Sequence, residues 1–314
     1  MKAIVLHKTG GAENLEFTEI DTPQIHPNEV LIRNKAISVN PVDYKVRTHE
    51  GALNMIYGEN RPAILGWDIA GEVTEIGSEV SKFKVGDRVF GMVNFLGNGN
   101  AYAEYVKAPQ DHLAIIPEDI SFESAAASTL AALTALQVLE GHVEKGNKVL
   151  IHAGSGGVGH FAIQIAKYLG AYIVSTSSTK NKELILSLGA DQHIDYRTEK
   201  FEEVLSDIDF VFDMFNGETL HKSVGIAKDG GMVVSIPSPD FAIETIELAK
   251  QRNVNLAFHM VQSSEKDIDT IRELLQFGVL KPHISKTYDF HEMQQAHKAL
   301  ESGRTIGKIV VTLK

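Results

Sequence analysis

An apolar run that ends in a glycine-rich turn constrains this chain more than any other stretch. Residues 148–153 are followed by Gly154, Gly156 and Gly159, and then by apolar residues at helical spacing. Between a strand and a helix, G-x-G-x-x-G spacing is typical of a dinucleotide site. The first glycine makes the turn, the second lets the backbone approach the pyrophosphate, and the third lets helix and strand pack closely. The free N–H groups and positive end of the helix face the phosphates. We therefore expect a dinucleotide to bind at Gly154, Ser155, Gly156, Gly157, Val158 and Gly159; the alternative is a turn that binds nothing.

The stretch after the next strand indicates which dinucleotide. NAD sites place Asp or Glu at the end of the second strand, about 20 residues on, to hold the ribose 2′-OH. Here no acidic residue occurs between Glu144 and Glu183, and the strand expected at 172–176 runs into hydroxyls and lysines. These groups suit the 2′-phosphate of NADPH, which a carboxylate would repel. A solvated polar turn is the alternative; we favour NADPH, bound through Ser177, Ser178, Lys180 and Lys182.

The bulk properties exclude several other classes. The 314 residues suffice for two domains, and the net charge of −11 does not favour a nucleic-acid partner. Without cysteine, disulfides, thiolate nucleophiles and Cys-ligated zinc are excluded. The apolar start of the chain is too short for a signal peptide or membrane span, so we expect a cytoplasmic protein without a membrane partner.

The order of strand and helix signals predicts an α/β protein with two kinds of unit. Residues 1 to about 120 read as short strands broken by Pro and Gly, a mostly β unit. From residue 121 an alanine-rich run predicts one helix or two. Six strand signals then alternate with helix signals, which predicts a doubly wound parallel sheet with the glycine turn after its first strand. We expect the last stretch, from residue 285, to pack back onto the N-terminal unit.

The whole chain resembles the medium-chain dehydrogenase/reductase superfamily, in its zinc-free quinone oxidoreductase branch. The resemblance is carried by N-P-V-D-Y-K-V-R at 40–47, G-W-D-I-A-G-E-V at 66–73, V-G-D-R-V at 85–89, the turn at 153–159, D-Y-R at 195–197, Asp213 and G-R-T-I-G-K-I-V at 303–310. It implies a discontinuous GroES-like catalytic domain, residues 1–121 and 264–314, around a Rossmann domain at 122–263. It also implies a homodimer formed through the sheet edge at 255–261.

The residues at the zinc positions of that superfamily differ in this chain. Zinc-dependent relatives carry Cys where this chain has Asn40, and His where it has Trp67, before Asp68. Catalytic zinc needs three protein ligands, and the 13 histidines form no ligand-spaced cluster. We therefore expect no metal, and we interpret Asp68 as a structural carboxylate.

Without zinc, alcohol oxidation lacks a group that stabilises an alkoxide, whereas hydride addition to a quinone or enone needs that help less. A donor near the acceptor oxygen would stabilise its developing charge. The candidates are the Asn40 amide and the Tyr44 hydroxyl, which the resemblance places beside the nicotinamide. Their alternatives are a turn residue and a half-buried aromatic.

Three further cofactor contacts are implied by the resemblance. Thr134 would approach the nicotinamide end, Tyr196 would pack near the adenosine ribose, and Lys308 would close on the cofactor. The alternatives are a threonine bonded to its own helix, a strand-end aromatic and a solvated lysine.

These observations predict an NADPH-dependent oxidoreductase that transfers hydride to a quinone or related conjugated carbonyl. One alternative is an enone or alkenal double-bond reductase with the same fold and cofactor. The other is a non-catalytic protein that binds NADPH as a sensor, because the motifs contain no obvious proton donor.

Overall fold

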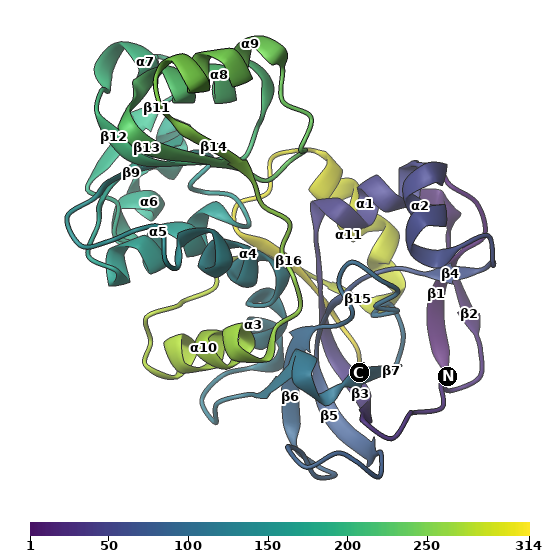
Figure 1. Cartoon of the computed structure of the whole chain (residues 1–314). Coiled ribbons are helices and arrows are strands. Elements are labelled where there is room, and N and C mark those ends of the chain that lie inside the picture. Colours follow the sequence, from purple (N-terminus) through teal and green to yellow (C-terminus); the bar gives the residue numbers. More distant parts are fainter. The chain divides into compact units, whose positions relative to one another are not determined.

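The computed structural model describes all 314 residues, which divide into two compact units (Figure 1). The first comprises residues 1–133 and 262–314, and the second residues 134–261. The boundaries expected at 121/122 and 263/264 differ from these divisions and stay predictions for the limits of the cofactor domain. No helix is both long enough and apolar enough to span a bilayer.

The first unit is built on a seven-stranded sheet and a smaller three-stranded sheet. The large sheet has the order β15-β16-β3-β5-β6-β8, with β7 also paired to β3; the small one has the order β2-β1-β4. All pairs are antiparallel except β15 with β16. The strands are β1 (Lys2–Leu6), β2 (Leu15–Glu19), β3 (Glu29–Val39), β4 (Ala63–Ile64), β5 (Asp68–Ile76), β6 (Arg88–Met92), β7 (Tyr105–Pro109), β8 (Leu113–Ile115), β15 (Ile284–Asp289) and β16 (Lys308–Thr312).

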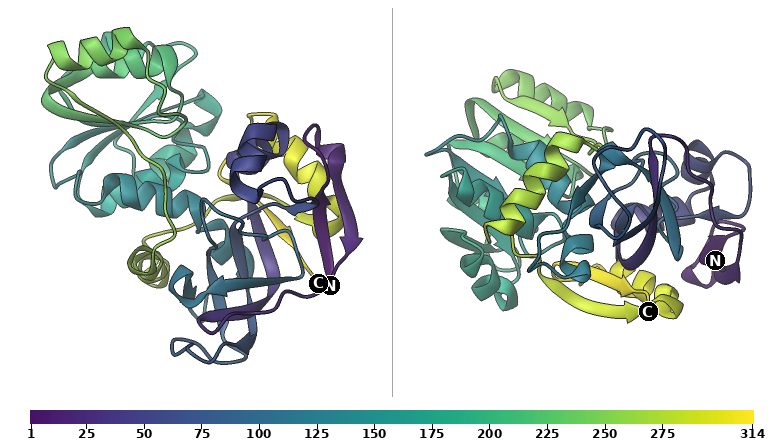
Figure 2. Two further views of the ribbon diagram at one scale, coloured as in Figure 1. Left: turned by 45° about the vertical axis from the view of Figure 1, so that its right-hand side comes forward. Right: turned by 90° about the horizontal axis from the view of Figure 1, so that it is seen from below.

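The end of the chain completes this unit. β16 lies against β3, and the helix before it packs against the first helix of the chain (Figure 2). The expectation that the C-terminal stretch returns to the N-terminal unit is therefore confirmed. The helices of this unit are α1 (Pro41–Thr48), α2 (Glu50–Tyr57), α3 (Phe122–Ala127), α10 (Glu265–Gln276) and α11 (Met293–Glu301); α4 (Leu130–Leu139) begins here and continues into the second unit.

The second unit is the doubly wound sheet that the alternating pattern predicted. Its six parallel strands have the order β11-β10-β9-β12-β13-β14. The strands after β9 are therefore added first on one side of it and then on the other. α5 and α6 cover one face, and α8 and α9 the other (Figure 1). The elements are β9 (Lys148–Ile151), α5 (Gly159–Tyr168), β10 (Tyr172–Ser177), α6 (Lys182–Ser187), β11 (Gln192–Asp195), α7 (Phe201–Val204), β12 (Ile208–Asp213), α8 (Gly217–Ile226), β13 (Ala227–Ser235), α9 (Ile243–Gln251) and β14 (Asn255–Phe258).

Two helices that the sequence reading missed follow Asn40. An Asn–Pro pair is typical of a turn, which was the alternative for Asn40, but α1 begins at Pro41 and α2 covers Glu50–Tyr57. Proline suits the first position of a helix, where its missing N–H is not needed. Two residues later, the Asp43 carboxylate accepts the Asn40 backbone N–H at 2.6 Å. A pattern that favours a turn here begins a helix, because Asn40 caps it.

Candidate functional site

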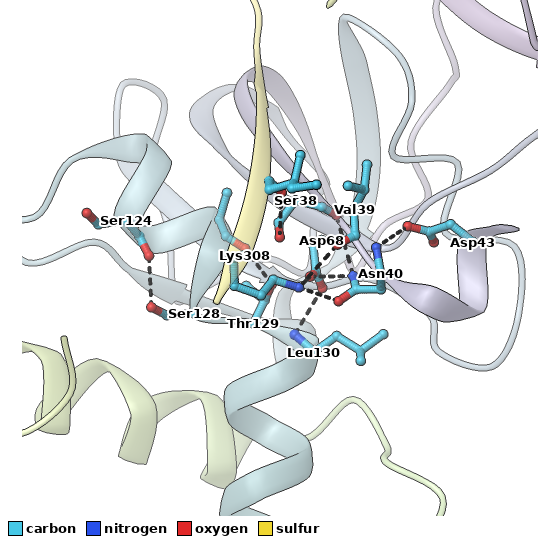
Figure 3. A network of polar contacts seen from close by, with 12 residues as sticks. Ser38, Val39, Asn40, Asp43, Asp68, Ser124, Ser128, Thr129, Leu130 and Lys308 are labelled. Carbon is cyan, nitrogen blue, oxygen red and sulfur yellow. Dashed lines mark hydrogen bonds and ion pairs between the residues drawn. The ribbon is translucent and has the colours of Figure 1, made fainter. Parts of the chain in front are cut away.

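The register of the large sheet brings three distant polar residues together at one end of β3. β16 pairs with β3 so that Ile309 faces Val39, and β5 pairs with β3 so that Asp68 faces Ser38. The residues that meet there are Asn40, Asp68 and Lys308, each at most 3% exposed. Figure 3 shows their side chains converging, with the Lys308 ammonium directed at the Asn40 amide.

Every polar atom of the Asn40 amide is engaged in this cluster. Its Nδ2 donates to Asp68 Oδ2 at 2.7 Å and to the Ser38 carbonyl oxygen at 3.4 Å, while its Oδ1 accepts from Lys308 Nζ. The ammonium also donates to the Val39 carbonyl oxygen at 3.3 Å and lies 3.9 Å from Asp68 Oδ2. The amide is therefore held in one orientation.

Asp68 connects this cluster to the start of α4. Its Oδ1 accepts the Leu130 backbone N–H at 3.0 Å, one of the N–H groups left unpaired at a helix start. Burial raises the pKa of the Asp68 carboxyl and lowers the pKa of the Lys308 ammonium, and each charge partly offsets the shift of the other. The structural role expected for Asp68 is thus seen, with backbone, amide and lysine partners.

A second buried network lies on the other side of Asn40. Asp43 Oδ2 accepts from the Tyr102 hydroxyl at 2.9 Å, and this hydroxyl also contacts His297 Nε2 at 3.0 Å. Burial raises the pKa of Asp43 to about 7 and lowers the pKa of His297 to about 3. These groups therefore favour their neutral forms inside the protein.

Tyr44, the other catalytic candidate, is half-buried on α1. No hydrogen bond within the chain engages its hydroxyl, so this donor is available to a ligand. The structure thus brings Lys308 to Asn40, a contact that the sequence did not suggest, and leaves Tyr44 apart from their hydrogen-bond network.

The cluster around Asn40 is a poor zinc site. Trp67 is fully buried and its indole N–H donates to the Gly97 carbonyl oxygen at 2.6 Å, so it offers no ligand. The Asp68 carboxylate is hydrogen-bonded to the Asn40 amide at 2.7 Å and lies 3.9 Å from the Lys308 ammonium, so a cation already occupies its neighbourhood. Zinc at a catalytic site takes three protein nitrogen, sulfur or carboxylate ligands, which these residues do not supply.

In the second unit, the glycine turn has the predicted strand–turn–helix form. The positive φ lies at Ala153 (48°), whereas Gly154 is required by space: a Cβ there would lie 2.0 Å from Ser175 Oγ. A Cβ at Gly159 would lie 2.3 Å from the Ala153 carbonyl oxygen, so the third glycine does allow helix and turn to pack closely.

The turn presents donors suited to phosphate. No hydrogen bond within the chain takes up the backbone N–H groups of Ser155, Gly157 or Val158, just before α5. N–H groups at the start of a helix favour anions through both their hydrogens and the helix dipole. These residues therefore fit a dinucleotide pyrophosphate.

The loop after β10 adjoins this turn. The Asn181 amide donates to Ser155 Oγ at 2.8 Å, which ties the residues expected at the 2′-phosphate to the glycine turn. Ser177 and Ser178 are buried at the end of β10, and Lys180 and Lys182 are exposed. The Asp195 carboxylate at the end of β11 reaches this loop. It accepts the Thr179 backbone N–H (3.0 Å), the Thr179 hydroxyl and the Arg197 backbone N–H (3.0 Å).

The remaining expected cofactor contacts lie on α4 and after β11. Thr134 is buried on α4, and Tyr196 is 60% exposed with the Arg197 guanidinium 5.8 Å from its ring centre. The sequence reading missed Asn181 and also His193, whose Nε2 contacts Ser177 Oγ at 3.0 Å. The alternation along β11, which places His193 and Asp195 on one face, was the available signal.

Comparison with known proteins gives the family. The profile of the alcohol dehydrogenase GroES-like domain matches residues 26–118, and that of the zinc-binding dehydrogenase domain matches residues 188–311. A solved quinone oxidoreductase from Coxiella burnetii is 37% identical, with a TM-score of 0.94 over 100% of this chain and 99% of that one. The chain belongs to the quinone oxidoreductase branch of the medium-chain dehydrogenase/reductase superfamily.

Two further relatives define the activity class. The Escherichia coli quinone oxidoreductase solved in complex with NADPH is 30% identical, with a TM-score of 0.89 over the full length of both chains. A 2-haloacrylate reductase from Burkholderia sp is 31% identical over 98% of each chain. This chain is therefore an NAD(P)H-dependent oxidoreductase of the quinone oxidoreductase or double-bond reductase type.

Proposed function

We propose that the chain is a cytoplasmic, NADPH-dependent quinone oxidoreductase that transfers hydride, without zinc, to a quinone or related conjugated carbonyl. The observation that carries the proposal is the cluster of Asn40, Asp68 and Lys308. A fixed amide stands at one of the positions where zinc-dependent relatives carry a ligand, and a buried ammonium is bonded to it. An acceptor that is already electron-poor needs no Lewis acid to take up hydride.

The second unit supplies the cofactor site in this proposal. The N–H groups of Ser155, Gly157 and Val158 bind the pyrophosphate. The end of β10 and the loop after it bind the 2′-phosphate through Ser177, Ser178, Lys180 and Lys182. Thr134, Tyr196 and Lys308 stay proposed contacts. NADPH supplies the hydride, and the chain supplies binding, orientation and electrostatics.

The first unit supplies the acceptor site. The Tyr44 hydroxyl, which has no partner within the chain, donates to the acceptor oxygen as negative charge develops there. The Asn40 amide is committed to Asp68, Ser38 and Lys308, so its contribution is to hold the first turn of α1, where Tyr44 lies.

We also propose a homodimer. β14 (Asn255–Phe258) is the edge strand of the parallel sheet, with one side paired to β13 and the other free. An unpaired edge is a template for a second copy of the same strand. Light scattering should give twice the chain mass of 34.4 kDa; a monomer would contradict this part of the proposal.

The function is tested by NADPH consumption, with NADH alongside, over ortho- and para-quinones, enals, enones and simple ketones. Rapid, NADPH-selective turnover of quinones is expected. Turnover of enals alone would make the chain a double-bond reductase, an alternative supported by the haloacrylate reductase relative. Binding of NADPH without turnover of any acceptor would favour a sensor.

A further inference from the structure

The basic side chains around the ends of β10 and β11 lack anionic partners. Lys180, Lys182 and Arg197 form no ion pair, and all three are exposed. Several other lysines of this unit are paired with carboxylates, at 2.8 Å or closer: Lys167, Lys200, Lys222 and Lys228. Unpaired positive charge is therefore concentrated beside the loop that follows β10.

A histidine is hydrogen-bonded into this region. The Ser177 hydroxyl donates to the Ser178 carbonyl oxygen at 3.0 Å, so its Oγ is left to accept from His193 Nε2, also at 3.0 Å. A hydroxyl has one hydrogen, so the Nε2 of His193 must carry a proton. The second ring nitrogen, Nδ1, is the one that gains a proton when the half-buried imidazole becomes positively charged.

Charged groups around His193 set the pKa of its imidazole. Burial lowers the pKa of His193; Asp195 and Glu199 raise it, and Lys182 lowers it. Asp195 already accepts backbone N–H groups from Thr179 and Arg197, so its charge is partly compensated. An anion placed beside Lys182 would offset the effect of the lysine and add its own attraction for the imidazolium.

We propose that His193 is part of the 2′-phosphate site and strengthens binding of NADPH, but not of NADH, when its imidazole is protonated. The inference rests on NADPH being the cofactor. A phosphate monoester carries about −1.5 to −2 charge near neutral pH and offers three acceptor oxygens. Beside Ser177, Ser178, Lys180 and Lys182, a positive imidazole adds a charge that only the phosphorylated cofactor uses. Histidine is the side chain that changes charge in this pH range.

The test is direct binding of NADPH and NADH to the full chain, followed by fluorescence, at about pH 6 and about pH 8. The variants are His193→Gln and, as a matched control, His221→Gln. His221 is another histidine of this unit, bonded to the Thr245 hydroxyl at 3.1 Å. Each variant is compared with the unaltered protein at the same pH. The 2′-phosphate of NADPH itself titrates near pH 6, and this comparison cancels its effect.

His193→Gln should weaken NADPH binding about fivefold at the lower pH, with a loss that shrinks toward none at the higher pH. NADH binding, and both cofactors in His221→Gln, should be unchanged relative to the unaltered protein. The same loss at both pH values, or an equal loss for NADH, would overturn the inference and leave the proposed function standing. No NADPH binding to the unaltered protein would overturn both.

A second measurement does not depend on the variant. The ring C–H resonance of His193 is followed by NMR as a function of pH in the free protein and with saturating NADPH or NADH. The pKa of His193 should be higher with NADPH than with NADH. Equal pKa values in the two complexes would contradict the proposal.

Discussion

Lys308 donates a hydrogen bond to the side-chain oxygen of Asn40, across a sequence separation of 268 residues. The contact exists because β16 pairs with β3 in the register that sets Ile309 against Val39. The same ammonium is the one cationic group close to Asp68, whose side chain is fully buried. The three residues are therefore expected to act as one electrostatic unit.

Lys308→Met should lower the free energy of unfolding by about 3–5 kcal/mol, because a buried carboxylate loses its counter-charge. Urea unfolding measures this, with Lys314→Met, whose side chain is 89% exposed, as the control. The double variant Lys308→Met, Asp68→Asn should be more stable than Lys308→Met alone. If Lys308→Met lowers the free energy of unfolding no more than Lys314→Met does, the Lys308–Asp68 pair does not stabilise the fold.

Tyr44→Phe should reduce kcat/KM for quinones by about 100-fold. This is the lower end of the range of rate losses typical when a positioned proton donor is removed. NADPH binding should be unchanged, because the hydroxyl is proposed to contact only the acceptor. Tyr168→Phe, at an exposed position on α5, is the matched control. Full activity of Tyr44→Phe would remove Tyr44 from the mechanism.

Gly159→Ala should destabilise the fold by roughly 1–3 kcal/mol and weaken NADPH binding, since helix and turn must separate to admit a methyl group. The added carbon would lie 2.3 Å from the Ala153 carbonyl oxygen and 2.8 Å from Gly154 Cα. Gly225→Ala on α8 is the control, with nothing within 4 Å of the new carbon. Thermal unfolding and NADPH titration of both variants distinguish a local clash from a general effect of alanine.

Lys182→Glu should weaken NADPH binding about tenfold or more and leave NADH binding almost unchanged, because an attraction to phosphate becomes a repulsion. Lys250→Glu, an exposed and unpaired lysine of α9, makes the same change of net charge elsewhere in the unit. Equal losses in the two variants would mean that only the overall charge of the unit matters.

Asp43 makes stability depend on pH in a defined direction. Its pKa rises from an ordinary 3.8 to about 7 in the folded protein because of burial. Between these values the folded protein holds a proton that the unfolded chain has released, so the Asp43 contribution to stability falls as pH rises from about 4 to about 7. His152 and His297, with pKa values lowered to about 4 and about 3, contribute the opposite slope below about pH 6.5.

Asp43→Asn isolates the carboxyl contribution, since the histidines are common to both proteins. The stability of the variant relative to the unaltered protein should increase with pH across that window. Denaturant midpoints at several pH values provide the measurement. A constant difference would show that Asp43 titrates at its ordinary pKa.

The second unit could be predicted almost element by element, whereas in the first the short strands were predicted but the helices α1 and α2 were not. In the second unit, apolar residues recur with the period of a strand or a helix, so each element and the glycine turn can be predicted from a short stretch of sequence. In the first, α1 was missed because Asn40–Pro41 favours a turn, and only the Asp43 carboxylate on the Asn40 N–H shows that it caps a helix.

The partners of the candidate site residues were harder to predict than the residues themselves. Asn40 and Lys308 were both singled out, yet their contact depends on the pairing of strands from opposite ends of the chain. His193 was passed over because a histidine in a strand has no motif. Its proposed role rests on the contact with Ser177 of the neighbouring strand β10. That contact depends on how the two strands are paired, which the sequence of one strand does not show.

The pairing of β16 with β3 also has a consequence for how the chain folds during synthesis. Residues 134–261 form a continuous segment, so all strands of the parallel sheet are synthesised before β16. In the first unit, by contrast, β3 precedes that segment in the sequence and β16 follows it. Domains generally fold as units as they emerge. Asn40 therefore cannot contact Lys308 until β16 has been synthesised, and until then the edge of β3 that β16 covers is unpaired.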